Sequence, residues 1–430
     1  GVSLSQTPGA MIGGNFGGLP TANGQGSEAG FRNWVMALRP RALAAGVTPG
    51  VFDSAMAGAH YQPGIVALDG RQSEFSKQIW EYLDGAVGGA RTSTGREMAA
   101  RHAGTLSAIE ARYGVPREVV LAVWGMESNY GANRGSTQIV PALATLAYDG
   151  RRGEFFAGEL VAALRILQAG DVDNGHLVGS WAGAMGHTQF MPSSFLNHAV
   201  DFNGDGRRDI WSDDPTDSLA STAAYLARSG WVPGLPAAVE VRLPANFNYG
   251  QTGRGNVKSG ATWASQGVVA VNGRSLPSGG IIAPAGAQGP AFLVTKNFMA
   301  IRAYNASDNY ALGVAMLGNR IGGGPGIVGA FPREAGALTH NQKEEVQRLL
   351  KAGEVIGMGR VVGDGGTVFV VVDIAVRRDH QGQGLGKRIM AALDTWLRAN
   401  APPSAYVMLI ADGDARHLYA QFGFEIGRHT

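Results

Sequence analysis

Apolar residues recur at three- and four-residue spacing from Phe31 to about Trp231. Segments such as FRNWVMALRPRALAAG and REMAARHAGTLSAIEARYG show this period, which is typical of helices that pack one face on a core. Several of these segments end at glycine, which readily adopts the left-handed conformation that stops a helix. The pattern therefore predicts a mostly helical region here. Residues 1–30 are polar and glycine-rich, and we expect a flexible leader there.

The helical period fades between residues 232 and 289. The run VEVRLP alternates apolar and polar residues as a strand does, and the remainder is rich in glycine, proline and serine. We therefore predict a small β-rich insertion at 232–289. Helical spacing returns with FMAIRAYNASDNYALGVAMLGNRI, so residues 31–335 are expected to form one domain that contains this insertion.

The pattern changes again near Gly353. A short amphipathic helix, THNQKEEVQRLLKA, is predicted within residues 336–352. It is followed by the strand-like runs VIGMGRVVG and TVFVVVDIAV, a glycine-rich turn, a helix, another strand and a closing helix. This α/β rhythm predicts a separate domain at 353–430, with a boundary near Lys351–Glu354.

Composition excludes several classes of protein. The 430 residues include no cysteine, which rules out disulfides, thiolate metal sites and a cysteine nucleophile. Hydrophobic residues make up 45% of the chain, too many for wholesale disorder. The net charge of +2 offers no basic surface for nucleic acid, so we expect no such partner. No apolar run approaches the length of about 18 residues that spans a membrane. Residues 1–30 do not show the charged start and apolar middle of a signal peptide, and we expect that they are what remains after a signal was removed or a cloning end.

A single carboxylate stands out in the segment YGVPREVVLAVWGMESNYG. In a helix, Glu127 shares a face with Val120, Val123 and Trp124. A carboxyl at the end of an apolar stripe loses hydration, which favours its neutral form and raises its pKa. A glycosidase general acid needs this environment. The alternative is a structural ion pair between Glu127 and Arg134, Arg151 or Arg152.

Four motifs together resemble the B-type lytic murein transglycosylases, soluble or lipid-anchored periplasmic enzymes that cleave peptidoglycan. They are VWGMESNYG, ALATLAYDGRRGEFFAGELVAALRIL, GSWAGAMGHTQFMPSSF and AVDFNGDGRRDIW, in the family's order between about Phe31 and Arg333. The resemblance implies a lysozyme-like fold with Glu127 as the acid–base residue. It places the glycan-groove residues at Ser180, Gln189, Tyr304, Asn305 and Tyr310.

The family's reaction needs one carboxylate and no cofactor. The resemblance implies that Glu127 protonates the oxygen between N-acetylmuramic acid (MurNAc) and N-acetylglucosamine (GlcNAc), then deprotonates the muramyl C6 hydroxyl, which closes a 1,6-anhydro ring. Consistent with this, ESNYGANRGSTQ contains no second acid. The expected partners are peptidoglycan strands and other cell-wall enzymes, in the periplasm or cell envelope. A peptidoglycan-binding protein without catalysis is the alternative.

The run DFNGDG fits a calcium-binding loop. Asp201, Asn203 and Asp205 provide alternate oxygens, and Asp209 falls at the ninth position. The twelfth position is Ser212 instead of glutamate, so this is not a standard EF-hand. The resembling family closes its loop with a later aspartate, here Asp217, although Asp213 and Asp214 compete for that role. We expect a structural calcium site; a metal-free surface turn is the alternative.

The C-terminal region resembles a different family. In DIAVRRDHQGQGLGKRIMAALDTWL the residues Gln381, Gly384 and Gly386, with Gly382 between them, fit the acetyl-CoA motif of GNAT-type N-acetyltransferases. Backbone N–H groups at a helix N-terminus form a concave site for the pyrophosphate of CoA. ARHLYAQFGFE resembles the closing GNAT motif, and the resemblance makes Tyr419 the general acid towards the departing thiolate. The match covers about Glu354 to Glu425.

This second resemblance is incomplete. The strand and two helices that build the acceptor side of a GNAT domain are missing, and residues 336–352 instead resemble a truncated peptidoglycan-binding module. Peptidoglycan lies outside the cytoplasmic membrane and acetyl-CoA inside it. We therefore interpret the segment as a folded remnant or a misjoined gene that does not use acetyl-CoA. The alternative is a bifunctional protein that acetylates an amine.

The predicted fold class is accordingly α+β. A mostly helical, lysozyme-like transglycosylase domain with a small β-rich insertion precedes a partial α/β GNAT-like sheet.

Overall fold

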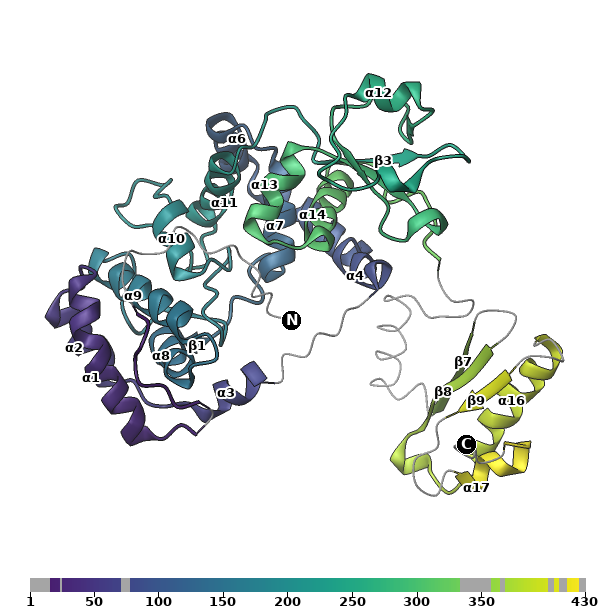
Figure 1. The fold of residues 1–430 in the computed structure, drawn as a ribbon, viewed down its shortest axis with the longest axis horizontal. Coiled ribbons are helices and arrows are strands. Elements are labelled where there is room, and N and C mark those ends of the chain that lie inside the picture. Colours follow the sequence, from purple (N-terminus) through teal and green to yellow (C-terminus); the bar gives the residue numbers. More distant parts are fainter. Residues whose placement is uncertain are drawn as a thin grey trace. The chain divides into compact units, whose positions relative to one another are not determined.

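A computed structural model describes residues 16–23, 25–70, 78–332, 357–363, 368–400, 406–409 and 416–424 (Figure 1). The chain divides into two compact units, Gly1–Ala330 and Phe331–Thr430. The predicted boundary near Lys351–Glu354 and the helix at 336–352 lie outside the described residues.

The first unit is mostly helical, as its sequence period predicts. Its N-terminal half contains α1 (Glu28–Ala44), α2 (Pro49–Ala57), α3 (Pro63–Gly70), α4 (Ile79–Ala86), α5 (Gly89–Arg101) and α6 (Ala103–Tyr113). Outside the β-rich insertion, the helices that follow are α7 (Arg117–Ser128), α8 (Ile139–Asp149), α9 (Gly153–Ala169), α10 (Pro192–His198), α11 (Thr216–Arg228), α13 (Lys296–Tyr304) and α14 (Asp308–Ile321). Among the described residues, no helix combines the length and apolar character needed to cross a membrane.

The centre of this unit is built around α7. All residues from Val120 to Gly125 are buried, and α14 packs along the helix while α5, α6 and α11 also contact it. Burying a large apolar side chain contributes about 1.5–3 kcal/mol to folding, so a helix buried over two turns is firmly held. The carboxyl end of α7 is therefore a rigid support for any residue that projects from it.

The segment before α1 differs from the predicted flexible leader. Phe16 and Leu19 are buried, and the backbone of Ala22 donates a hydrogen bond to the carbonyl of Tyr148. The ring of Phe16 lies against α9 beside Gly158, a contact that the polar composition of residues 1–30 does not predict. The described part of this segment is thus packed on the helical unit.

The β-rich insertion is present but longer than predicted. Four antiparallel strands lie in the order β4-β3-β6-β5. Their bounds are β3 (Ala238–Arg242), β4 (Val269–Ala270), β5 (Gly280–Ile282) and β6 (Ala291–Val294). β6 falls beyond the predicted limit of 289 because all four of its residues are buried, so its sequence lacks the alternation that marks a half-exposed strand. Trp263 of α12 (Gly260–Ser265) fills the core of this insertion, and the short 3₁₀ turns η1 (Tyr249–Gln251) and η2 (Gly286–Gln288) complete it.

The second unit has the predicted α/β character. Strands β7 (Gly357–Gly363), β8 (Val368–Val376) and β9 (Tyr406–Leu409) lie in that order, the first pair antiparallel and the second parallel. The helix α16 (Leu385–Asn400) makes the crossover between the parallel strands, as such a connection requires. Short helical turns complete the described part: η3 (Arg378–His380), α17 (Arg416–Tyr419) and η5 (Ala420–Phe422).

Candidate active site

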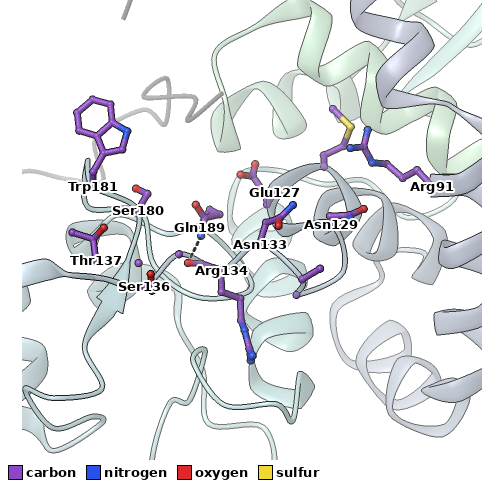
Figure 2. Close-up of a pocket in the computed structure, with 15 residues that line it drawn as sticks. Arg91, Glu127, Asn129, Asn133, Arg134, Ser136, Thr137, Ser180, Trp181 and Gln189 are labelled. Atoms are coloured by element: carbon purple, nitrogen blue, oxygen red, sulfur yellow. Dashed lines mark hydrogen bonds between the residues drawn. The ribbon is translucent and has the colours of Figure 1, made fainter. Parts of the chain in front are cut away.

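A cleft of about 810 Å³ lies at the carboxyl end of α7. One wall is the loop that follows this helix, and the other includes a two-stranded ribbon of β1 (Thr137–Gln138) and β2 (Val178–Gly179). Figure 2 shows Glu127 between Arg91 on one side and Ser180 and Trp181 on the other. The lining is mostly polar: Arg91, Glu127, Asn129, Asn133, Arg134, Ser136, Thr137, Ser180, Trp181 and Gln189.

Glu127 occupies the last turn of α7 and is partly buried. The helix ends at Ser128. The next residue, Asn129, has a φ of 49° in the left-handed region, and Tyr130 follows with φ 57°. Burial raises the pKa of Glu127 to about 7, although the hydrogen bond from Tyr310 opposes this rise. The predicted combination of an apolar helix face and a carboxyl with a raised pKa is therefore present in the structure.

Tyr310 is the direct partner of Glu127. It lies in the first turn of α14, where Ser307 caps the helix, and its hydroxyl donates a 2.6 Å hydrogen bond to Oε1 of Glu127. Burial, together with the nearby Glu127 carboxyl, raises the pKa of Tyr310 well above its usual value, so the phenol keeps its proton. The sequence analysis placed Tyr310 in the glycan groove but did not foresee this contact. No spacing rule links residues 183 positions apart.

The structural alternative for Glu127 is wrong, because the three candidate arginines have other partners. Arg134 pairs with Asp213 at 2.7 Å, while Arg151 and Arg152 both contact the buried Asp69. Among the described residues, Glu127 forms no ion pair.

Two of the predicted groove residues line the cleft. The hydroxyl of Ser180 accepts a hydrogen bond from the Ala184 amide at 3.0 Å, which fixes the loop after β2. Gln189 has a φ of 52°, and its side-chain amide donates to the carbonyls of Arg134 (3.1 Å) and Gly186 (2.9 Å). Figure 2 shows the first of these bonds. Positive φ at a non-glycine residue is costly, and such strain is concentrated at functional sites.

Tyr304 and Asn305 differ from the prediction. Tyr304 is completely buried, packs against Phe190 and Tyr225, and donates its hydroxyl to the Thr188 carbonyl at 2.6 Å. Asn305 is also buried, and its Oδ1 accepts from the Ser307 amide at 3.2 Å. Both side chains therefore lie in the core instead of lining the cleft, because the end of α13 turns them inwards. Tyr304 supports the wall of the cleft from behind through its bond to Thr188, next to Gln189.

Several cleft residues were missed by the sequence analysis, among them Arg91, Asn129, Asn133 and Trp181. Asn129 carried a usable signal, because asparagine directly after a helix is typical of a left-handed stop and brings the next loop close to the helix end. Arg91 carried none, since it reaches the cleft from α5, in a separate helix.

The predicted cation loop brings three carboxylates together. Oxygens of Asp201, Asp205 and Asp217 lie within 4.8 Å of one another. Asp217, in the first turn of α11, is buried and accepts hydrogen bonds from the amides of Phe202, Asn203 and Asp209. Burial and the nearby Asp201 raise the pKa of Asp217. Converging carboxylates are the hard oxygen donors that calcium prefers, so these residues fit that ion.

The other acidic candidates point elsewhere. Asp209, predicted as a ligand, is not among the converging carboxylates: its Oδ1 accepts from the amides of Trp211 and Ser212, which folds it into its own turn. Asp213 pairs with Arg134, and Asp214 accepts from the amide and hydroxyl of Thr216. Asn203 stays beside the cluster, with its Oδ1 accepting from the Asp205 amide. Of the three aspartates predicted for the closing position of the loop, Asp217 is therefore the one that faces Asp201 and Asp205.

The C-terminal motif lies at the start of α16. Gly382 and Gly384 have φ values of 77° and 74°, which a side chain would disfavour, and Gly386 lies in the first turn of the helix. The exposed Gln381 donates its side-chain amide to the Val376 carbonyl at 3.1 Å. Tyr419 is buried in the core of this unit against residues that include Phe369, Val371, Met390 and Leu397. The predicted acid is therefore mostly shielded from solvent.

These features agree with comparisons with known proteins. Residues 30–319 match the transglycosylase SLT domain family, so the chain belongs to this family. Residues 344–426 match the acetyltransferase (GNAT) domain family. The second match includes residues 344–352, which we predicted to be part of a peptidoglycan-binding helix.

Individual relatives extend the picture. The crystal structure of SltB3 from Pseudomonas aeruginosa in complex with NAG-anhNAM-pentapeptide is 46% identical, covers 76% of this chain and 91% of its own, and superposes with a TM-score of 0.68. The Escherichia coli lytic transglycosylase Slt35 in complex with calcium is 29% identical, covers 73% and 96%, and gives a TM-score of 0.55. Membrane-bound lytic murein transglycosylase B from Escherichia coli K12 is 46% identical over 128 residues, which are 30% of this chain and only 35% of that protein.

Proposed function

We propose that this protein is a lytic transglycosylase that cleaves the MurNAc–GlcNAc β-1,4 bond of peptidoglycan and leaves 1,6-anhydro-MurNAc ends. The single observation that carries this proposal is Glu127, a carboxyl with a pKa of about 7 in a polar cleft. Glu127 is the only acid among the residues that line the described cleft. The NAG-anhNAM-pentapeptide bound to SltB3 has the kind of end that this reaction would produce.

A single residue can act as acid and then as base when its pKa lies near the working pH. Because burial raises the pKa of Glu127 to about 7, a protonated carboxyl is available near neutrality to donate to the glycosidic oxygen. The carboxylate that results can take the proton of the C6 hydroxyl, whose oxygen attacks the anomeric carbon. A hydrolase would instead need a second carboxylate, as nucleophile or as base for a water molecule.

The neighbouring side chains have distinct roles in this proposal. Tyr310 orients Glu127 and limits the rise of its pKa through the 2.6 Å hydrogen bond. Ser180 and Gln189, on the opposite side of the cleft, contact the sugar hydroxyl and acetamido groups. Tyr304 holds the wall that carries Gln189, through the bond of its hydroxyl to the Thr188 carbonyl.

The test is digestion of purified peptidoglycan, followed by mass spectrometry of the released muropeptides. We expect products with 1,6-anhydro ends, and the Glu127→Gln variant should release them about 10³-fold more slowly. Products with reducing ends would instead show hydrolysis and contradict the proposal. Binding without any product would favour the second candidate function, a peptidoglycan-binding protein without catalysis.

We further propose that Asp201, Asp205 and Asp217 hold a structural calcium ion. Slt35 was crystallised in complex with calcium, and its fold resembles that of the first unit. With calcium in hundredfold excess over its dissociation constant, binding stabilises the folded state by about 2.7 kcal/mol. Calcium should therefore raise the melting temperature by several degrees, whereas Asp217→Asn should melt at the same temperature with calcium or with chelator. An unchanged melting temperature of the unsubstituted protein would contradict this site.

A location in the cell envelope, in the periplasm, follows from the proposed substrate. The C-terminal unit is proposed to be a folded remnant without turnover of its own, since acetyl-CoA is not expected where peptidoglycan lies. Acetylation of an amine on a wall fragment would be the result that favours a bifunctional protein.

A further inference from the structure

His187 lies in the loop that carries Gln189 and is almost completely buried, at 4% exposure. Its ring contacts Trp124, which precedes Glu127 by one helical turn: the indole N–H of Trp124 donates to Nδ1 of His187 at 3.0 Å. The backbone carbonyl of His187 accepts a 2.8 Å hydrogen bond from the hydroxyl of Ser128, the residue directly after Glu127. One residue thus contacts α7 on both sides of Glu127.

The ring has a defined protonation state in this arrangement. Because Nδ1 accepts the indole hydrogen, the neutral imidazole must carry its proton on Nε2. Nε2 lies 2.7 Å from the Ser212 carbonyl and donates to it. Arg134 approaches Nε2 at 3.2 Å but has better acceptors in the carbonyls of Trp211 (3.0 Å) and Ser212 (2.8 Å). Burial lowers the pKa of His187, which agrees with a neutral ring.

The backbone of the same loop is also fixed. The amide of His187 donates to the Ile210 carbonyl at 3.0 Å. Gly131, in the loop after α7, has a φ of 85°, and a side chain there would come within 2.5 Å of the His187 ring. The ring therefore packs directly on the loop that forms one wall of the cleft.

These contacts join three segments that are far apart in sequence: the end of α7, the loop of Gln189 and the segment 210–212. We infer that His187 is a positioning residue that holds Glu127 and Gln189 at a fixed separation across the cleft. This inference rests on the proposed function, since it assigns His187 to the alignment of that same site. His187 itself does not touch the substrate.

The decisive comparison is between two substitutions. His187→Leu has a similar volume but removes the acceptor for Trp124 and the donor to Ser212, whereas the amide of His187→Gln can replace both. We expect kcat for release of anhydro-muropeptides to fall about 100-fold in His187→Leu, with KM changed less than threefold. His187→Gln should keep at least a third of the kcat of the unsubstituted protein. The matched control is His176→Leu, an exposed histidine paired with Asp173, which should leave kcat unchanged.

A kcat for folded His187→Leu within threefold of the unsubstituted protein would overturn the inference, as would an equal loss in His187→Gln. If His187→Leu does not fold, Trp124→Phe replaces it: this variant removes the indole donor and should lower kcat about tenfold, and an unchanged kcat would overturn the inference.

A readout independent of turnover separates this inference from the proposed function. The indole N–H resonance of Trp124 should be shifted and protected from exchange in the unsubstituted protein and in His187→Gln. A fast-exchanging Trp124 indole would overturn the positioning role, whatever the activity. If the Trp124 indole is protected but the protein produces no anhydro-muropeptides, the contact with His187 is present and the proposed function is contradicted instead.

Discussion

The two units of this chain place their characteristic residues in opposite environments. Glu127 projects from a buried helix into a polar cleft, partly buried and hydrogen-bonded to a tyrosine. In the C-terminal unit Gln381 is exposed and donates to the backbone carbonyl of Val376, while Tyr419 is packed into the core. The comparison teaches that a family motif supplies the residue types, whereas the surroundings decide whether a group has the pKa and access that chemistry needs.

The largest expected effect tests the first half of this comparison. Glu127→Gln keeps the shape of the side chain but cannot give and take a proton, so the rate of anhydro-muropeptide release should fall about 10³-fold, within the range of general acid–base catalysis. The control is Glu154→Gln, an exposed position on α9 that should keep full activity. Comparable rates for Glu127→Gln and the unsubstituted protein would remove Glu127 from the mechanism.

The next effect is on stability and follows from the raised pKa. Burial favours the protonated carboxyl of Glu127 in the folded protein. The stabilisation that results is fully present below pH 4.5, the ordinary pKa of glutamate, and is lost as pH rises through about 7. One pKa unit corresponds to 1.36 kcal/mol, so the unsubstituted protein should lose about 3 kcal/mol relative to Glu127→Gln between pH 4 and pH 8. Denaturant unfolding of both proteins at these two pH values measures the difference. Parallel pH profiles would show that Glu127 titrates normally.

A smaller effect is expected at Tyr310. Its hydrogen bond favours the charged form of Glu127, so Tyr310→Phe should raise the pKa of Glu127 above about 7. The alkaline limb of the pH–rate profile should move to higher pH, and kcat at neutral pH should fall roughly tenfold because the carboxyl is no longer oriented. Tyr249→Phe, on the half-exposed ring of η1, is a control that should keep the original profile. An alkaline limb that stays in place in Tyr310→Phe would assign it to another group.

The smallest expected effect concerns the C-terminal unit. Calorimetric titration of the full chain with acetyl-CoA should give no binding heat, because this unit is proposed to be a remnant. Gly384→Ala should therefore also leave the titration unchanged. Tight binding of acetyl-CoA that Gly384→Ala weakens would contradict the remnant hypothesis and show that the glycine-rich turn binds this ligand.

Much of the first unit could be predicted because its signals are local. Helical spacing of apolar residues and glycine at helix ends indicate most of its helices. The same spacing places Glu127 on an apolar helix face, while its acid–base role was predicted from the family resemblance. β6 could not be found in this way, since a fully buried strand has no alternation. The burial of Phe16 and Leu19 could not be predicted from the sequence for a related reason. Two isolated apolar residues in a polar segment form no periodic pattern that would indicate packing on a core.

The calcium loop shows the same limit at the scale of single residues. The pattern D-x-N-x-D-G indicates Asp201 and Asp205 directly, because alternate residues of a tight loop face one point. The closing ligand is not periodic with them, and the sequence left Asp213, Asp214 and Asp217 as competitors. The choice depends on which carboxylate the start of α11 turns towards the loop, and α11 is oriented by its packing on other helices.

By itself, then, the sequence determined the helical character of the first unit, the position of one carboxyl on an apolar helix face and the presence of a second, α/β module. Each of these depends on residues close together along the chain. Only the tertiary structure decided that Tyr310 holds Glu127, that Tyr304 and Asn305 are buried in the core, and that His187 joins α7 to the loop of Gln189. The hydrogen bonds Ser128–His187, Tyr304–Thr188 and Tyr310–Glu127 link residues 59, 116 and 183 positions apart, and such pairs come together only when the packing of whole helices fixes their separation.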